Sequence, residues 1–501
     1  MAALLAASPI ALVLALMLGL RWSAARAGLL ALALAGMLAV FAFDVGGPDR
    51  TAPGRVGALG GALLEAAFIA TTILWIIFPA LCIHALQVRR RAIDLLRRRL
   101  EGLSADPAVL GLLIAWFFAL FIEGAAGFGA PVALAAPLLV ALGFAPTQAV
   151  AMALIGHSVG VSFGAVGTPI LPQAAATGLS LGQLSSTPGL LHGLLGWILM
   201  LFLLRVMRRV GTAPPLPLAL LAAGLFLVPL VGFATLSGPE LPTLGGALVG
   251  GLVFVRILRR RTSSTQRPTS AQGTLRAALP YLVLVVLILA TRLVPALREA
   301  LQAVELAWHL PGGFAGSFAP LYHPGTMLLL AFVIGGLGQR GAAADLLAAM
   351  AEAARRLAPV VVALLAMLGL ARIMVHAGMI DTLATAAAAL TGAAWPAMAA
   401  AVGVLGTFIT GSATTSNILL TDFQVRVAET LDLPLLAILG AQAFGAAVGN
   451  IVCPHNFVAG GATVGLAGRE GEVLRATLLP CLVYTVAGGL LTSLLVALSS
   501  S

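Results

Sequence analysis

Residues 121–170 read FIEGAAGFGAPVALAAPLLVALGFAPTQAVAMALIGHSVGVSFGAVGTPI, and this stretch decides the fold. One carboxylate, Glu123, stands at the end of an apolar helix that we expect from Val109 to Ile122. A glycine-rich break follows, and a new apolar helix begins at Pro131, a residue suited to the first helical position. Membrane transporters build sites inside the bilayer from broken apolar helices of this kind. The stretch therefore predicts a polar site within a membrane.

A second copy of this pattern runs from Phe408 to Gly465. Three pairs of anchors fall in nearly the same register: Phe121 with Phe408, Pro146 with Pro434, and Pro169 with Pro454. Because chance rarely gives a shared register, the pattern predicts two structural repeats, as found in many secondary transporters. The alternative is that two glycine-rich apolar stretches are alike in composition alone.

Composition places the chain in a membrane. Of its 501 residues, 60% are hydrophobic and 9% are charged, whereas about 25% of the residues in a soluble protein are charged. All 28 basic residues are arginine, and the net charge is +10. The arginines fall between apolar runs, so the positive-inside rule explains them better than nucleic-acid binding. The three cysteines give neither a disulfide framework nor metal-ligand spacing.

Clusters of arginine set the expected orientation. The strongest cytoplasmic marker is Arg89–Leu100, and the basic linker Arg259–Arg276 is another. Counting back three crossings from the first marker places the N-terminus outside the membrane. Arg21 and Arg26 follow the first apolar run instead of preceding it, which indicates a transmembrane helix and not a cleaved signal peptide.

The expected fold class is an all-α polytopic membrane protein with about 12–14 helical segments, in two inverted repeats with re-entrant hairpins and broken helices. The helix from Pro131 to Leu142 would span about 18 Å, which is too short to cross a bilayer. The charged loop Arg469–Arg475 corresponds to the uncharged loop Thr177–Thr187, as inverted topology requires. The expected divisions of the chain are residues 1–106, 107–209, 210–356 and 357–501.

Three further segments carry specific expectations. Pro295–Pro324 has several aromatic residues and is expected to lie outside, at the membrane interface. Ala342–Leu357 is expected to be an amphipathic helix, separate from a span at Pro359–Val375. Ile380–Leu390 is expected to be a weak helix that does not cross fully.

The block EGAAGFGAP, Glu123–Pro131, resembles the L-lactate permease family of bacterial transporters. The resemblance continues in FGAVGTPI and resumes in FITGSATTSN and GATVGLAGREGEVLR. It implies uptake of lactate or glycolate, small 2-hydroxy monocarboxylates, together with a proton. The chain departs from the family pattern where relatives carry an acid and a lysine, because it has Ala413 and Asn450 there. It also has Arg372 where an uncharged residue is expected.

Glu123 is the strongest candidate for proton coupling. A carboxylate at the centre of a transmembrane helix costs roughly 2.5–3.5 kcal/mol on insertion scales, so one that is kept there usually has a function. We expect Glu123 to carry the coupled proton. The alternative is a structural acid that accepts hydrogen bonds from the amides of the broken loop beside it.

Arg372 is the candidate ligand for a substrate carboxylate, since it lies in an apolar span and its guanidinium can bind a carboxylate through two bonds. The alternative is an arginine near a helix end that extends to the interface.

The hairpin tips and the helix breaks supply the remaining candidates for substrate binding. Exposed N–H groups at a tip attract a carboxylate, although Ser and Thr at a helix start can equally be simple N-caps. A lone histidine among apolar residues is more often a packing residue than a proton relay. The candidates at the tips are Gly127, Gly129, Ser412, Thr414, Thr415, Ser416 and Asn417, and those at the breaks are His157, Asn450, His455 and Asn456.

A secondary transporter fits these features best. The sequence contains no HExxH metal motif, no intramembrane pair of acids for Mg²⁺ and no Walker loop, so a membrane enzyme or an ATP-driven pump is disfavoured. We expect no cofactor, no metal and no nucleic acid. The expected partners are a small carboxylate, protons and the lipid bilayer. Na⁺ is the alternative coupling ion, with another organic carboxylate as its cargo, and the long scaffold helices are compatible with a homodimer.

Overall fold

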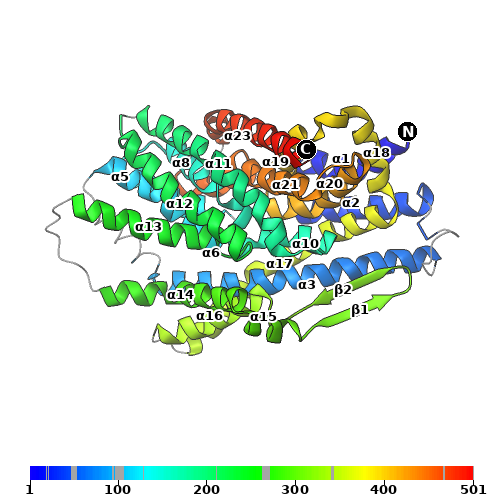
Figure 1. Ribbon diagram of the computed structural model, residues 1–501, viewed down its shortest axis with the longest axis horizontal. Coiled ribbons are helices and arrows are strands. Elements are labelled where there is room, and N and C mark those ends of the chain that lie inside the picture. Colours follow the sequence, from blue (N-terminus) through cyan, green and yellow to red (C-terminus); the bar gives the residue numbers. More distant parts are fainter. Residues whose placement is uncertain are drawn as a thin grey trace.

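The computed structural model describes residues 1–18, 20, 22–43, 45–46, 54–92, 95, 106–127, 129–209, 211–261, 271–339, 343–466 and 469–499. Helices make up most of this part of the chain, together with one two-stranded sheet (Figure 1). Within it, 8 helices are long and apolar enough to cross a membrane, or up to 11 if each bent pair counts as one span. The predicted all-α polytopic class is confirmed.

The first hairpin and the first broken helix follow the predicted order. The segments α5 (Pro107–Leu112), η1 (Leu113–Phe118, a π-helix) and α6 (Ala119–Ala125) run as one span, and α7 (Ala130–Ala141) packs back against α6. The broken helix consists of α8 (Pro146–Ser158), the short turns η2 (Val161–Phe163), α9 (Gly164–Gly167) and η3 (Thr168–Ile170), and α10 (Leu171–Thr177). Its two arms meet at 64°.

The same series of elements occurs again near the C-terminus. It comprises α19 (Trp395–Thr410), α20 (Ala413–Thr430), α21 (Leu435–Val448), η5 (Gly449–Ile451) and α22 (Pro454–Thr463). The last helix is α23 (Glu470–Ser499). A hairpin tip and a helix break therefore occur a second time, at the positions that the matched residues of the two repeats predicted. The inverted orientation of the two repeats stays a prediction.

The helices that precede each repeat form a scaffold. It contains α1 (Ala2–Leu18), α2 (Ala24–Phe41), α3 (Gly54–Arg89) and α17 (Ala343–His376), and α17 packs against both α2 and α3. The two expected segments, an amphipathic helix at Ala342–Leu357 and a span at Pro359–Val375, correspond to the two arms of α17, which bends by 41° between Ala358 and Val360. A short helix, α18 (Met379–Thr391), continues through the turn η4 (Gly392–Ala394) into α19, and Met379–Phe408 is one candidate span.

The middle of the chain contributes further long helices and an appendage. The helices are α11 (Leu181–Arg208), α12 (Leu216–Leu236), α13 (Pro242–Arg261), α14 (Ala271–Leu293) and α16 (Pro324–Gly338). The predicted external segment forms a short helix, α15 (Pro295–Gln302), and a hairpin of β1 (Leu306–Leu310) and β2 (Phe314–Phe318), with Leu306 opposite Phe318. Most of the predicted basic linker, residues 262–270, lies outside the described residues.

Each broken helix is shared between the two repeats. α8 packs against α7 of its own hairpin, whereas α10 packs against α20 of the second hairpin. In the same way α21 packs against α19 and α20, whereas α22 packs against α7 and α8. The two breaks therefore lie where the two repeats meet.

Two glycines at corresponding places allow this close packing. A Cβ on Gly156 of α8 would overlap the carbonyl of Ala115, and a Cβ on Gly445 of α21 would overlap the carbonyl of Ala400. Both glycines thus bring a broken helix into backbone contact with the first helix of its own hairpin. Small residues at such contacts are typical of helix packing in membranes.

We predict that Gly156→Ala and Gly445→Ala each lower the stability of the protein by about 1–3 kcal/mol, because the added methyl group must push two helix backbones apart. The measurement is the melting temperature of the purified protein in detergent. Gly60→Ala is the matched control, since nothing lies within 4 Å of a Cβ placed there, and alanine is the better helix former. Equal melting temperatures for all three variants would contradict the prediction.

Candidate functional site

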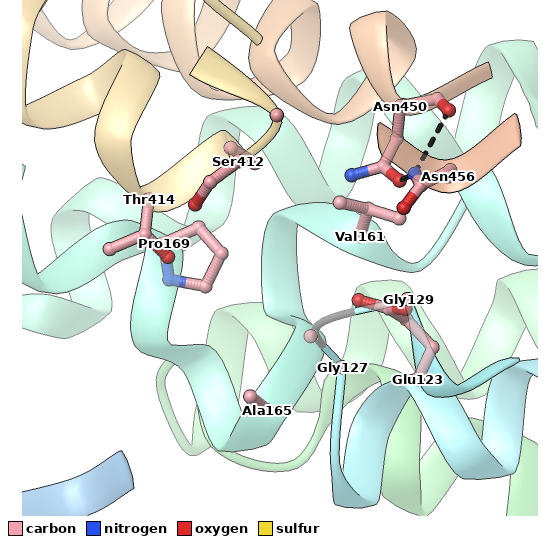
Figure 2. A pocket seen from close by; sticks show the side chains of 13 residues that line it. Glu123, Gly127, Gly129, Val161, Ala165, Pro169, Ser412, Thr414, Asn450 and Asn456 are labelled. Atoms are coloured by element: carbon pink, nitrogen blue, oxygen red, sulfur yellow. Dashed lines mark hydrogen bonds between the residues drawn. The ribbon is translucent and has the colours of Figure 1, made fainter. Parts of the chain in front are cut away.

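A small pocket lies between the two hairpin tips and the two breaks (Figure 2). Its volume of about 40 Å³ gives room for about three water molecules. Both repeats contribute to its walls. The described lining residues are Glu123, Gly127, Gly129, Val161, Gly164, Ala165, Pro169, Gly411, Ser412, Ala413, Thr414, Asn450 and Asn456.

Glu123 is the only ionisable residue among these lining residues. It stands in the last turn of α6 and is 5% exposed. Its position is fixed by glycines on either side, because a Cβ on Gly124 would meet the backbone of Leu244, and a Cβ on Gly164 would overlap Oε1 of Glu123 itself. The carboxylate is therefore held directly against the first break.

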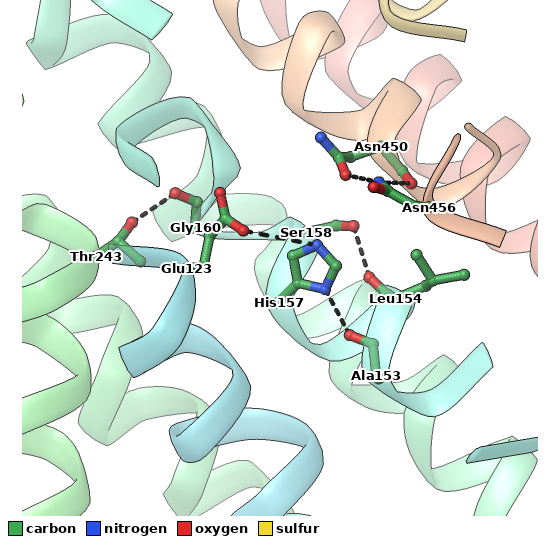
Figure 3. Close-up of polar contacts among 9 residues, drawn as sticks. All are labelled: Glu123, Ala153, Leu154, His157, Ser158, Gly160, Thr243, Asn450 and Asn456. Carbon is green, nitrogen blue, oxygen red and sulfur yellow. Dashed lines mark hydrogen bonds and ion pairs between the residues drawn. The ribbon is translucent and has the colours of Figure 1, made fainter. Parts of the chain in front are cut away.

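His157 lies behind Glu123, at the end of α8 (Figure 3). Its Nε2 is 3.8 Å from Oε2 of Glu123, and its Nδ1 is 2.6 Å from the carbonyl oxygen of Ala153. Since a carbonyl only accepts, Nδ1 carries a hydrogen, and Nε2 is the nitrogen that can take up or release a proton. His157 is buried and lies outside the described lining of the pocket, where it contacts both Glu123 and the side chain of Asn450.

The first break contains a left-handed turn. Ala165 (φ 43°, ψ 51°) and Val166 (φ 57°, ψ 42°) are followed by Gly167 (φ 82°, ψ 10°). The left-handed region costs an L-residue roughly 1–2 kcal/mol, and a β-branched valine rarely adopts it. The hydroxyl of Thr168 donates to the carbonyl of Ala165 and closes the turn. Backbone strain of this kind persists only where the surroundings enforce it.

The first tip touches this turn. Gly127 (φ 57°) and Gly129 (φ 80°) adopt backbone conformations that favour glycine. A Cβ on Gly127 would be 3.1 Å from the Cβ of Ala165. Tip and break are thus packed backbone to backbone, with Glu123 beside both.

The second tip presents hydroxyl groups from the start of α20. Ser412 is the N-cap, and its Oγ accepts from the backbone N–H of Thr415 at 3.3 Å. Ser412 and Thr414, two of the predicted substrate-binding residues, line the pocket, whereas Thr415, Ser416 and Asn417 are not among its described lining residues. The hydroxyl of Ser416 donates to the carbonyl of Gly403, which directs it into the second hairpin.

The second break contributes two amides. The Nδ2 of Asn456 donates to Oδ1 of Asn450 (Figures 2 and 3). It also donates to the backbone carbonyl oxygen of Asn450 at 3.2 Å. Both side chains line the pocket. His455 is exposed and is not among the described lining residues, although its Cβ would be 3.2 Å from a Cβ placed on Gly411 of the tip.

Arg372 lies outside the described pocket lining. Its guanidinium, on α17, forms an ion pair with Asp422 of α20, and both side chains are mostly buried. Sequence reasoning gave Arg372 no partner because the acid lies on another helix, fifty positions away in the chain. Binding of a substrate carboxylate by Arg372 stays a prediction.

Sequence reasoning missed several lining residues, among them Val161, Ala165 and Pro169. No side-chain chemistry could have identified the apolar ones, which line the pocket because the chain bends there. The prolines and glycines around Gly164–Pro169 did mark the bend.

The sequence is similar to proteins of known families. A model of the L-lactate permease family matches residues 2–499. The chain belongs to the L-lactate permease family. An L-lactate permease of Streptococcus iniae is 32% identical over 376 residues, covering 72% of this chain and 78% of that protein. The glycolate permease GlcA of Escherichia coli K12 is 28% identical, covering 99% of this chain and 95% of that protein.

A solved structure supports the fold. The MtrF protein of Neisseria gonorrhoeae, described as one of a class of antimetabolite efflux pumps, aligns with a TM-score of 0.54 at 15% sequence identity, over 94% of this chain and 95% of that one. This permease-family member is a multi-pass membrane transporter and not an enzyme. Ala413 and Asn450, two of the positions where the sequence is expected to depart from the family pattern, both line the pocket.

We predict that Ala165→Gly raises the stability of the protein by about 1 kcal/mol, because glycine adopts the left-handed conformation without a steric cost. Ala151→Gly is the matched control: Ala151 is a fully buried alanine inside α8, where glycine is expected to destabilise by about 1 kcal/mol. The melting temperatures of the two variants should shift in opposite directions. A decrease for both would mean that the left-handed turn is not strained.

Proposed function

We propose that this protein carries a small 2-hydroxy monocarboxylate, lactate or glycolate, into the cell in symport with protons. The observation that carries the proposal is Glu123, the one ionisable side chain among the described residues of a pocket that both repeats share. The names of its relatives, an L-lactate permease and a glycolate permease, supply the substrate class.

Charge balance explains why a proton would accompany the substrate. Two unit negative charges about 4 Å apart repel each other by about 4 kcal/mol at an effective dielectric constant of about 20. An ionised Glu123 would therefore disfavour a carboxylate in this small pocket. Protonation of Glu123 removes the repulsion, so the loaded site holds one anion and one proton together. His157, 3.8 Å behind the acid, is placed to exchange that proton.

The remaining lining groups suit a small carboxylate with a hydroxyl group. No arginine or lysine is found among the described lining residues. The substrate would instead be held by the hydroxyls of Ser412 and Thr414, the amides of Asn450 and Asn456, and the N–H groups of the tips. Such neutral donors bind an anion without cancelling the charge that couples it to the proton.

The proposal includes an orientation in a bacterial inner membrane, with the N-terminus outside. Two arginine-rich helix ends, those of α3 at Arg89 and α13 at Arg261, lie at one end of the molecule, and the β1–β2 hairpin lies at the other (Figure 1). The positive-inside rule assigns the arginine-rich end to the cytoplasm. A homodimer and the inverted relation of the repeats belong to the same proposal.

The test is uptake of radiolabelled L-lactate and glycolate into proteoliposomes under an imposed pH gradient, without Na⁺. We expect uptake that disappears when the gradient is collapsed by a protonophore. Uptake that requires Na⁺ and ignores the pH gradient would overturn proton symport in favour of the Na⁺-coupled alternative. Failure to take up either acid under both conditions would overturn the substrate class.

We predict that Glu123→Gln abolishes uptake driven by the pH gradient, because the amide has the shape of the protonated acid but cannot release a proton. Binding of substrate, measured as a ligand-induced rise in melting temperature, should persist.

Glu65→Gln is the matched control. Glu65 is a mostly buried acid of α3 outside the pocket, bonded to His376 at 2.7 Å and to the N–H of Ala315 at 3.1 Å. It should retain gradient-driven uptake. Unchanged coupling in Glu123→Gln would exclude Glu123 as the proton carrier.

A further inference from the structure

A chain of hydrogen bonds runs through buried side chains from the second hairpin to the first break. The indole Nε1 of Trp395 donates to Oε1 of Gln424 at 3.0 Å, and Nε2 of Gln424 donates to Oε1 of Gln442 at 3.0 Å. Nε2 of Gln442 then donates to Oδ1 of Asn417 at 3.3 Å. Nδ2 of Asn417 finally donates to the carbonyl oxygen of Pro169 at 2.7 Å.

The direction of this chain is fixed at both ends. An indole nitrogen can only donate, and a backbone carbonyl can only accept. Gln424 must therefore turn its oxygen towards Trp395, which turns its NH₂ group towards Gln442. The same requirement passes through Gln442 to Asn417, whose NH₂ group is left facing Pro169. Each amide thus has one orientation that satisfies all of its neighbours.

The end of the chain is a wall of the pocket. Pro169 lines the pocket directly after the strained turn. In a 3₁₀ turn, the carbonyl of Pro169 would accept from the N–H of residue 172. That residue is Pro172, which has no N–H. Asn417 supplies a donor from the other repeat. Asn417 lies one turn after Thr414 on α20. The bond from Asn417 to Pro169 therefore sets the spacing between Pro169 and Thr414, two lining residues from different repeats.

We propose that Gln442 and Gln424 are positioning residues for the substrate pocket. They orient Asn417, which holds the Pro169 wall against α20. Asn417, Gln424 and Gln442 are fully buried, and none of them lines the pocket. Asn417, expected from the sequence to bind substrate, then acts on the substrate only through Pro169. The transport readout below rests on the proposed function, whereas the labelling readout does not.

The first experiment compares Gln442→Met with Gln87→Met. Methionine keeps the length of the side chain and removes both hydrogen-bonding groups. Gln87 is an equally buried glutamine, bonded to the carbonyl of Ala277 at 2.6 Å and to Gln339 at 3.0 Å, on the scaffold helix α3. Both variants should lower the melting temperature. Only Gln442→Met should raise the KM for lactate, by about threefold to tenfold, as expected for the loss of one buried hydrogen bond.

A double-mutant cycle tests the route of the effect. If Gln442 acts through Asn417, then Gln442→Met should leave KM unchanged in a protein that already carries Asn417→Leu. Two independent and multiplying increases in KM would overturn the proposal. An unchanged KM in Gln442→Met with a lowered melting temperature would also overturn it, because that result describes a purely structural bond. Trp395→Phe, which removes the terminal donor and keeps an aromatic ring against Phe423, replaces Gln442→Met if the latter does not fold.

A labelling experiment separates this proposal from the proposed function. If the wild-type protein takes up neither lactate nor glycolate, the proposed function is overturned. The role of the hydrogen-bond chain can then still be tested by labelling a residue of the pocket. The three native cysteines are buried and can be replaced by alanine. Ser412→Cys then reports on the pocket through its rate of reaction with a water-soluble maleimide. We expect Gln442→Met to change that rate by about threefold or more and Gln87→Met to leave it unchanged. Equal rates in all three backgrounds would overturn the positioning role.

Discussion

Backbone groups inside a bilayer must find hydrogen-bonding partners within the protein, and the rest of this structure depends on that requirement. Each tip and each break frees N–H and C=O groups that a continuous helix would have satisfied. The structure brings the four irregular segments together at one place and surrounds them with helices. Some partners are side chains of the same repeat, as Thr168 is for Ala165, and others come from the opposite repeat, as Asn417 does for Pro169. A polar pocket is therefore a product of the same packing that makes the breaks tolerable.

The acid at the centre follows the same logic. Glu123 is placed by what its neighbours lack: Gly124 and Gly164 have no side chains, so the carboxylate fits against the break and no other group does. The hydroxyls and amides opposite it are neutral. An ionisable group surrounded by neutral donors changes the charge of the whole site when it gains or loses one proton. Under the proposed function, this change of charge would couple a proton directly to an anion.

Much of this architecture could be predicted from the sequence, because it is encoded by residues with strong local preferences. Proline at helix starts and glycine at tips marked both hairpins and both breaks, and one acid in an apolar stretch marked the site. Long-range partners were not encoded in that way. Nothing near Arg372 in the sequence points to Asp422, and nothing in α20 alone shows that Asn417 faces Pro169 while Thr414 faces the pocket.

The conformation of the first break was also beyond sequence reasoning. Alanine and valine have no preference for the left-handed turn that Ala165 and Val166 adopt. That conformation is imposed by contacts with the tip at Gly127 and by Thr168. Tertiary packing outweighed the local signal there.

The sharing of each broken helix between the repeats has a consequence for biosynthesis. The bond from Thr147, at the start of α8, to Glu472 joins residues 325 positions apart. At a synthesis rate of about 5–20 residues per second, the first hairpin would wait roughly 15–65 s for the chain that completes its surroundings. Through that interval Glu123 has no second tip opposite it, and α10 has no α20 to pack against. The pocket is therefore among the last parts of the molecule to form, and its assembly requires that both repeats have been inserted.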